Sequence, residues 1–218
     1  MPDSQDSDEI VFTRTIRDLQ VRNGSRDSYA KMEARGGWSD VISPQLAQFI
    51  AQQNSFYLAT ANASGQPYIQ HRGGPRGFLK VLDAHTLGMA DFRGNRQFIS
   101  QGNLLDNAKA FIFLMDYANR RRIKIWGEAR MVEGDAELIA QLMPEDYAAA
   151  PERALLFTVT AWDPNCPQHI PRKYDQDQVD AMLAEKDAEI ARLVQEIARV
   201  TGSSGQAERG VGQMDRST

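Results

Sequence analysis

The segment KAFIFLMDYANRRRIKIWGEARMVE, residues 109–133, contains two runs of β-branched and aromatic residues separated by a short turn. Residues 109–116 and 122–133 have the composition of β-strands, and Ala118-Asn119 between them is a turn signal. A connection this short disfavours a parallel pair, which needs a crossover of a dozen or more residues. The segment therefore predicts two antiparallel neighbours.

Similar runs occur on both sides of this segment. Turn residues separate them, for example at 62–65 and 83–85. The further strand candidates are residues 56–61, 67–72, 77–83, 86–92 and 155–163. Six or seven short strands at this spacing, with few helices among the first four, indicate an antiparallel barrel or sandwich.

Helices are expected at three places around these strands. Ser43 and Pro44 have the residue types of an N-cap and a first helical position, so a short helix should follow to residue 50. Asn95 is expected to cap a helix that runs to about residue 107. Asp135 is expected to cap a third helix, which places Leu138, Ile139 and Leu142 on one face.

The two ends of the chain differ from this central region. Residues 1–42 are polar, with helical stretches around 12–19 and 28–33, and are interpreted as an N-terminal arm. Residues 177–200 have apolar residues at spacings of three and four, which predicts a long amphipathic helix. A core-packed helix is the favoured interpretation, and a self-associating coiled coil is the alternative. Residues 201–218 are rich in Gly, Ser and charge, and are expected to be disordered.

Composition indicates an ordinary globular protein. Of the 218 residues, 42% are hydrophobic and 25% are charged, and the net charge of −4 argues against a general nucleic-acid binder. The acidic N-terminus lacks a signal-peptide pattern, and no apolar run approaches 18 residues, so a cytoplasmic protein without membrane contact is expected. Cys166 is the only cysteine and cannot form an internal disulfide.

One part of the chain departs from the overall negative charge. Residues 72–124 contain ten Lys and Arg against four Asp, a local net charge of +6. Antiparallel strands would bring these cations, which fall at strand ends and turns, to one rim of a barrel. The sequence Arg93-Gly94-Asn95-Arg96 adds a close-approaching glycine and arginine forks, which favour a phosphate. RNA is the weakest candidate among the anions, because few aromatic residues accompany the cations.

Two other motifs are weaker. The segment 70–75, QHRGGP, lacks the Lys-Ser/Thr ending and the following helix of a phosphate-binding P-loop, so a P-loop is rejected. Cys166 and His169 have metal-ligand spacing, but two ligands do not make a site, and no metal is expected. A turn that places this pair near a cofactor of a partner subunit is the alternative.

Four segments in order resemble one known family. They are GQPYIQHRGGPRGFLKVLD (65–83), TLGMADFRGNRQ (86–97), NLLDNAKAFIFLMD (103–116) and RRRIKIWGEAR (120–130). Together they are similar to the core of the pyridoxamine 5'-phosphate oxidase-like family, the FMN-binding split barrels, over roughly residues 45–133. The resemblance implies a six-stranded antiparallel split barrel, which we expect over residues 43–163. Residues 164–200 are expected to form a connector and the C-terminal helix predicted above. The resemblance also implies a homodimer with FMN between the subunits.

The resemblance also assigns cofactor-binding positions. Arg72 corresponds to the strand that lines the flavin groove, and Lys80 to a lysine near the isoalloxazine ring. Arg122 corresponds to a residue, usually glutamine in the true oxidases, that reaches a carbonyl at the edge of the ring. A fixed cation there would stabilise negative charge on the ring.

The remaining assigned positions surround the phosphate or the substrate. Asn95, Arg96 and Gln97 match the turn that grips the ribityl phosphate, and Arg93 belongs to the same basic stretch. His71 could face the flavin or the substrate, although a strand histidine without a functional role is an equal alternative.

The sequence departs from the true oxidases in the substrate region. Their Tyr-x3-Arg-x3-Ser motif is replaced here by Tyr147, Pro151 and Leu155, and their C-terminal Trp and Arg-x-His segment is missing. Pyridoxamine phosphate is therefore not the expected substrate. The function predicted is an FMN-dependent oxidoreductase of unknown small-molecule substrate, with hydride carried at flavin N5 and no identified catalytic side chain. The alternatives are an FMN-binding protein without turnover and a flavin reductase or haem-degrading relative.

Overall fold

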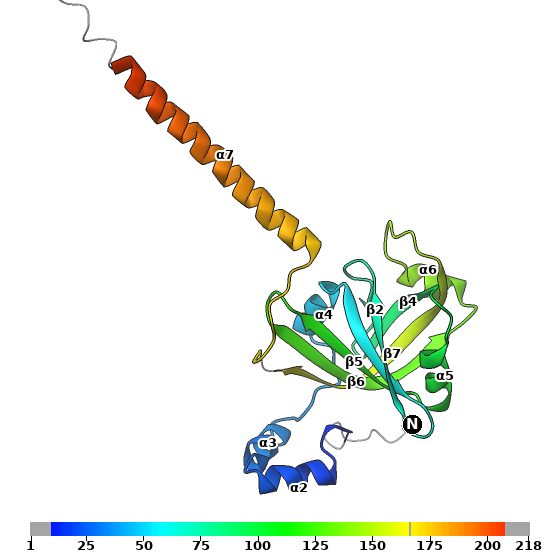
Figure 1. The fold of residues 1–218 in the computed structure, drawn as a ribbon. Coiled ribbons are helices and arrows are strands. Elements are labelled where there is room, and N and C mark those ends of the chain that lie inside the picture. Colours follow the sequence, from blue (N-terminus) through cyan, green and yellow to red (C-terminus); the bar gives the residue numbers. More distant parts are fainter. Residues whose placement is uncertain (1–9, 166, 208–218) are drawn as a thin grey trace, which may run out of the picture. The chain divides into compact units, whose positions relative to one another are not determined.

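The computed structural model describes residues 10–165 and 167–207 (Figure 1). The chain divides into two compact units, Met1–Pro171 and Arg172–Thr218. In the described part of the chain, no helix has the length and apolar character needed to cross a membrane.

The first unit is built on one antiparallel sheet that curves into a split barrel (Figure 1). Its spatial order is β2-β1-β5-β6-β7-β4-β3. The strands are β1 Ser55–Ala61, β2 Pro67–Gly73, β3 Lys80–Val81, β4 Thr86–Phe92, β5 Lys109–Asp116, β6 Arg121–Val132 and β7 Pro151–Asn165. The predicted mainly β fold with flanking helices is confirmed.

One strand is shorter than the sequence indicated. The run 77–83 yields only the two-residue β3, which makes a short seventh strand where six were predicted. The amide of Phe78 donates to the carbonyl of Pro75 at 3.0 Å, and Gly77 has φ +79°. The chain is therefore turning before Lys80, and a turn of this kind cannot join a sheet ladder.

The β5–β6 hairpin has the predicted antiparallel pairing, from Lys109 opposite Glu128 to Asp116 opposite Arg121. At the turn, the amide of Asn119 donates to Asp116 Oδ1 at 3.0 Å. The side chains alternate between the two faces of the hairpin, so that Ile112 and Ile125 are fully buried. The hairpin thus supplies the centre of the barrel core.

Helices close the barrel at two places. α4, Pro44–Ala51, buries Leu46, Phe49 and Ile50, and the Ser43 hydroxyl accepts from the amide of Leu46 at 3.2 Å. α6, Ala136–Leu142, packs Leu142 against β4 and β7. Its N-cap is Asp135, whose side chain accepts from the amide of Leu138 at 2.9 Å. Both predicted caps are confirmed.

The described part of the N-terminal region contains two short helices, as expected. They are α2, Arg14–Arg22, and α3, Arg26–Glu33. A ladder of aromatic contacts joins this region to the outside of β6: Phe12 lies 5.6 Å from Trp38, and Trp38 lies 6.2 Å from Trp126, between ring centroids. The region therefore packs on the sheet through edge-to-face and tilted aromatic contacts.

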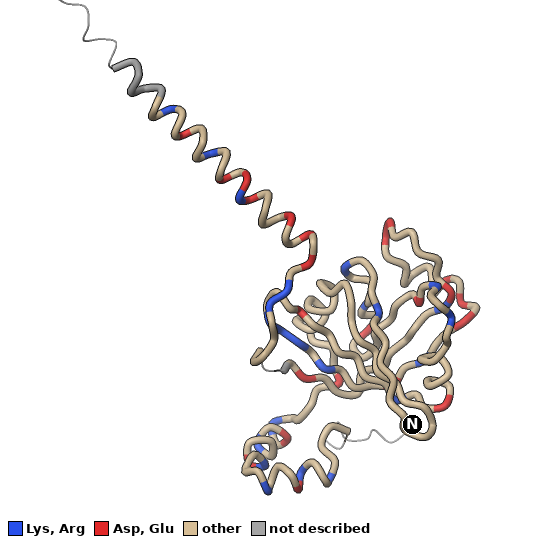
Figure 2. The backbone as a smooth tube through the Cα atoms, viewed as in Figure 1, with Lys and Arg blue, Asp and Glu red and all other residues tan. Residues whose placement is uncertain are grey.

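The C-terminal unit contains one long helix, α7, Gln176–Ala207. The predicted helix is confirmed and extends seven residues beyond Val200, to Ala207. Within this unit Leu183, Ile190 and Ile197 are each more than half exposed, and the core-packed interpretation of the helix stays a prediction. Acidic and basic residues alternate with uncharged ones along the described part of the helix (Figure 2). Residues 208–218, the rest of the predicted tail, lie outside the described residues.

Gly127 provides a test of barrel packing. It is buried at a register shift between β6 and β7, where a Cβ would overlap the carbonyl oxygen of Thr158 and the ring of Phe157. We expect Gly127→Ala to lower the free energy of unfolding by about 1–3 kcal/mol, because the neighbouring strand and ring must move.

Gly102→Ala is the matched control. Gly102 lies in an exposed helical position with nothing within 4 Å of an added Cβ, so alanine there should be neutral or stabilising by up to about 1 kcal/mol. Urea unfolding of both variants gives the comparison. Equal stabilities for the two variants would contradict the packing at Gly127.

Candidate functional site

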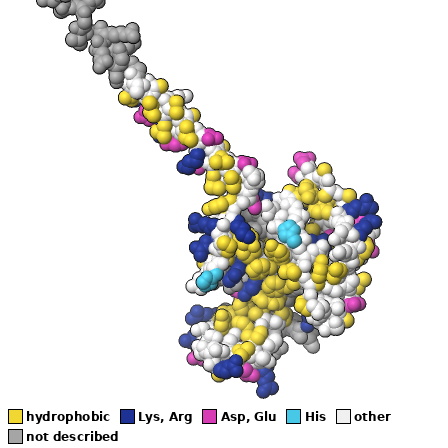
Figure 3. Space-filling view, in the orientation of Figure 1, with side chains coloured by type: hydrophobic (Ala, Val, Ile, Leu, Met, Phe, Trp, Pro, Cys, Tyr) yellow, Lys and Arg dark blue, Asp and Glu magenta, His cyan; other side chains and the backbone are white. Residues whose placement is uncertain are grey.

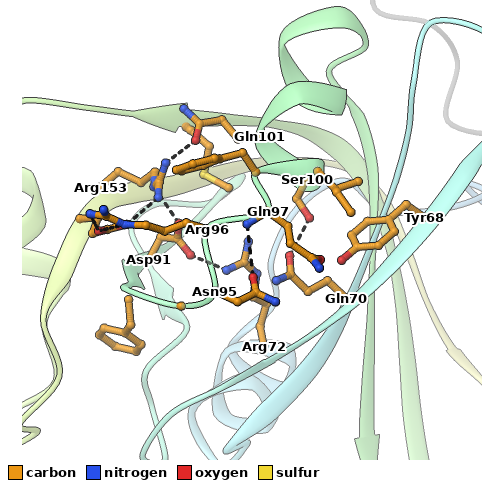
Figure 4. A pocket seen from close by; sticks show the side chains of 16 residues that line it. Tyr68, Gln70, Arg72, Asp91, Asn95, Arg96, Gln97, Ser100, Gln101 and Arg153 are labelled. Atoms are coloured by element: carbon orange, nitrogen blue, oxygen red, sulfur yellow. Dashed lines mark hydrogen bonds and ion pairs between the residues drawn. The ribbon is translucent and has the colours of Figure 1, made fainter.

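A polar pocket lies where the two ends of the open sheet approach each other (Figure 4). Inward-facing Tyr68, Gln70 and Arg72 of β2 form one wall. The opposite wall is built from the end of β4, the loop that follows it, the start of α5 (Ile99–Asp106) and the start of β7. Strand alternation explains the first wall, because every second residue of β2 faces the same side.

Asp91 is the central charge of this pocket. Its carboxylate forms ion pairs with Arg72 of β2 and, at 2.9 Å, with Nε of Arg153 of β7. The side chains of Asp91 and Arg153 are only 7% and 9% exposed. Buried charges are tolerated when they are paired, and here one carboxylate faces two guanidinium groups.

The Arg72–Asp91 pair also has a structural effect. β2 and β4 are not neighbours in the sheet order, so no backbone ladder joins them. The ion pair therefore connects strands from opposite parts of the open sheet. A second side-chain contact lies beside it, since the Ser100 hydroxyl of α5 donates to Gln70 Oε1 at 2.7 Å.

Glu152 neutralises the arginines of the loop after β4. Arg93 Nε and Arg96 Nε donate to Glu152 Oε1 at 3.2 and 3.1 Å. The hydrogen bond from Arg96, followed by its charge and the contact with Arg93, lowers the pKa of Glu152 below its usual value. Because the pKa is lowered, the ion pairs are intact at neutral pH and are lost only as the pH falls through that lowered value.

The loop has an unusual backbone. Arg96 and Phe98 have φ of 58° and 56°, left-handed values that residues other than glycine seldom adopt. Asn95 Oδ1 accepts from the amide of Gln97 at 3.3 Å, which stabilises the bend. Such strained positions cluster at functional sites.

The prediction that Asn95 caps the following helix is wrong. α5 begins at Ile99 with Phe98 at the N-cap position, and Phe98 provides no side-chain hydrogen bond. Asn95 instead closes the turn described above. The first turn of α5 therefore has no side-chain acceptor at its N-cap, and its residues Ile99, Ser100 and Gln101 line the pocket. An uncapped helix N-terminus attracts anions through its amides and dipole.

The overall charge of the lining is positive. Three arginines, at 72, 96 and 153, face two carboxylates, at 91 and 152, for a net charge of +1. The Nε of Arg72 is buried without a hydrogen-bond partner among the described residues. The pocket can thus accept an anion with several hydrogen-bond acceptors.

The structure brings together five of the eight predicted cofactor-binding residues. Arg72, Asn95, Arg96 and Gln97 line the pocket, and Arg93 joins them through Glu152. Figure 4 shows Arg72 and Gln97 on facing sides of the same space.

The other three predicted residues lie elsewhere. Lys80 donates from Nζ to the carbonyls of Gln141 and Met143, at 2.7 and 3.0 Å, at the end of α6. His71 is exposed and contacts the Tyr57 ring edge at 5.7 Å between centroids. Arg122 is the second residue of β6, and its buried Nε has no hydrogen-bond partner in the described part of the chain. Their cofactor roles stay predictions.

Three charged residues of the pocket were missed as site residues from the sequence: Asp91, Glu152 and Arg153. Asp91 offered a signal, because an aspartate inside the apolar strand run TLGMADF requires a buried partner. Nothing local identified that partner, since Arg153 lies 62 positions further along the chain.

The Cys166–His169 hypothesis cannot be followed into the structure, since Cys166 lies outside the described residues. His169 itself is an exposed turn residue with φ 62°. Among the described residues there is no group of three or more His, Cys, Asp or Glu arranged to hold a metal ion.

Solved structures with a related arrangement include HupZ of Group A Streptococcus, at 18% identity and TM-score 0.47, covering 61% of this chain and 99% of HupZ. A putative pyridoxamine 5'-phosphate oxidase from Lactobacillus delbrueckii has 16% identity and TM-score 0.45, with 57% and 95% covered. An FMN-binding protein from Syntrophomonas wolfei has 14% identity and TM-score 0.45, with 67% and 97% covered. No curated protein sequence gave a significant match.

The family comparison covers the whole barrel. A sequence model described as pyridoxamine 5'-phosphate oxidase matches residues 42–166, more than half of the chain. This range begins before α4 and ends after β7, so it includes every strand that builds the pocket. The chain belongs to the pyridoxamine 5'-phosphate oxidase family.

Proposed function

We propose that this protein is an FMN-dependent oxidoreductase that holds the phosphate of FMN in the pocket between β2 and α5. The observation that carries the proposal is the uncapped N-terminus of α5, which opens into a pocket lined by Arg72 and Arg96. Family membership supports a flavin as the ligand, because FMN is the cofactor that the resemblance implies.

The residues present fit a phosphate monoester. Arg72 has a buried, unpaired Nε, and Arg96 offers a guanidinium fork at the mouth of the pocket. Asn95, Gln97 and Ser100 add neutral polar groups around the same space. Charge-assisted hydrogen bonds from guanidinium groups, together with helix amides, are a common means of binding phosphate.

Bound FMN would supply hydride transfer at N5. The chain's own contribution is to hold the cofactor and set its electrostatic surroundings. Guanidinium groups bind and orient anions and are not general acids or bases. A reaction that needs no side-chain proton transfer, with hydride passing between the cofactor and a small molecule other than pyridoxamine phosphate, suits this pocket.

We infer that two chains complete the site. Lys80, His71 and Arg122 lie outside the pocket lining. The resemblance implies positions near the flavin ring for Lys80 and Arg122, and His71 could face the flavin or the substrate. A homodimer with FMN between the subunits would let residues of one chain reach the flavin held by the other. The buried, unpaired Nε of Arg122 supports this arrangement.

The first test compares FMN with riboflavin, which lacks the phosphate. The desalted protein is examined for visible flavin absorbance, any chromophore is identified, and the affinities of the two flavins are measured by fluorescence quenching. Arg96→Ala should weaken FMN binding by roughly tenfold to a hundredfold and leave riboflavin binding unchanged, because it removes a charged hydrogen bond to phosphate.

Arg130→Ala is the control, because Arg130 is an exposed arginine of β6 outside the pocket lining. Equal losses for both flavins in Arg96→Ala would contradict phosphate binding at this loop. A protein that binds FMN but turns over no reductant would be an FMN carrier instead.

A second prediction concerns Glu152. Its carboxylate already occupies the guanidinium groups of Arg93 and Arg96, so it competes with any phosphate at the loop. Glu152→Gln removes this like charge and should tighten FMN binding by roughly fivefold. Titration calorimetry with FMN measures the change, and riboflavin serves as the uncharged comparison. Weaker FMN binding in this variant would show that Glu152 orders the loop rather than competing with the ligand.

A third prediction concerns Arg122. A fixed cation beside the flavin favours its electron-rich, reduced form. Arg122→Gln should therefore lower the midpoint potential of bound FMN by on the order of tens of millivolts. Spectroelectrochemical titration measures it, with Arg130→Gln as the charge-matched control. Identical shifts in both variants would mean that only overall charge matters and that Arg122 does not contact the flavin.

A further inference from the structure

The long helix α7 carries an apolar stripe with the seven-residue period of a coiled coil. In heptad notation, the a positions hold Leu183, Ile190 and Ile197, and the d positions hold Val179, Lys186, Leu193 and Val200. Ile190 and Ile197 at a, with Leu193 at d between them, match the combination that favours parallel two-stranded coils. The stripe spans about three heptads.

This stripe is exposed in the C-terminal unit taken by itself. The exposed fractions are 56% for Leu183, 57% for Ile190, 42% for Leu193, 62% for Ile197 and 56% for Val200. Hydrophobic side chains gather along the described part of the helix in Figure 3. A helix in water derives most of its stability from packing an apolar face, so a stripe of this length requires a partner.

We propose that the partner is a second copy of this chain and that two α7 helices form a parallel coiled coil. In a symmetric parallel pair, each apolar side chain of the stripe is buried against the same residue of the other helix: Ile190 packs on Ile190, and Leu193 packs on Leu193. The proposal concerns a surface separate from the cofactor pocket and does not depend on what that pocket binds.

The charges that flank the stripe favour the parallel orientation. In a parallel pair, each g residue faces the next e residue of the other helix, so Glu189 lies beside Val194 and Glu196 beside Thr201. No like charges meet in these contacts. In the antiparallel pair that stacks the same layers, Glu189 would face Glu196 of the other helix, and like charges at such positions are destabilising.

Arg192, at an outer c position, forms ion pairs with the two glutamates that flank the stripe. Its guanidinium donates to Glu189 Oε1 at 2.8 Å and Oε2 at 3.0 Å, and to Glu196 Oε2 at 3.5 Å. Because both glutamates are g residues, Arg192 partly neutralises the flank of the stripe. Pairs at these spacings also stabilise the helix itself.

Lys186 is the polar exception in the core positions. In the parallel pair it lies next to Asp187 of the other helix, an e residue of opposite charge, and the symmetry produces this contact twice. A lone polar residue in the seam lowers stability but fixes register. Lys186 thus favours one register of the two helices over the others.

Disulfide trapping in the full-length protein tests the proposal. In a Cys166→Ser background, Leu193→Cys places a thiol at a d position, and Gln195→Cys places one two residues away at the outward f position. After mild oxidation at micromolar concentration, non-reducing electrophoresis should show covalent dimers for Leu193→Cys at a rate at least about tenfold above Gln195→Cys. Equal rates for the two variants would overturn the coil.

Two further measurements cover the remaining outcomes. In the first, the Ile190→Cys and Leu193→Cys proteins are mixed and oxidised together. Covalent dimers between the two variants, with none from Leu193→Cys alone, would show an antiparallel pair and overturn the parallel assignment. Leu193→Glu should reduce the helical ellipticity at 222 nm, because a charge in the seam separates the helices. Unchanged ellipticity would show that α7 is stable alone and would contradict pairing.

Discussion

The ion pairs of Asp91 with Arg72 and Arg153 connect parts of the barrel that the backbone leaves unjoined. β2 and β4 are separated in the sheet order by four other strands, so only side chains link them. One buried carboxylate between two guanidinium groups provides that link. Removing Asp91 would leave two buried cations facing each other, at a cost of about 3–5 kcal/mol for a broken buried pair.

This arrangement explains why the pocket lies where the sheet is open. A closed barrel fills its interior with side chains, as the apolar core does here around β5 and β6. Between β2 and β4, where no backbone hydrogen bonds join the strands, polar side chains make the connection. Their three arginines outnumber their two carboxylates, so the pocket keeps a net positive charge. The same residues therefore close the fold and create an attractive position for an anion.

The sequence predicted the sheet well because its signals are local. β5 and β6 are runs of β-branched and aromatic residues joined by a short turn, and the caps Ser43 and Asp135 mark their helices within a single turn. The start of α5 was misplaced because Phe98 has no capping side chain and adopts a left-handed backbone, for which the sequence carries no mark. The same limit applied to β3, where Pro75 and Gly77 turn the chain.

The candidate site was predictable only in part, for a related reason. Arg72, Asn95, Arg96 and Gln97 could be found because they lie in two short stretches with a distinctive composition. Glu152 and Arg153 lie in β7, far along the chain, and enter the pocket only because β7 pairs with β4. Contacts between distant strands depend on sheet order, which propensity and spacing do not encode.

The paired form of α7 would also change how the barrels meet. Two chains joined through their C-terminal helices keep their barrels at an effective concentration that reaches the millimolar range for short linkers. A barrel-to-barrel contact too weak to persist between free molecules would then be occupied most of the time. Such barrels could separate to exchange a bound molecule and reassociate with the same partner.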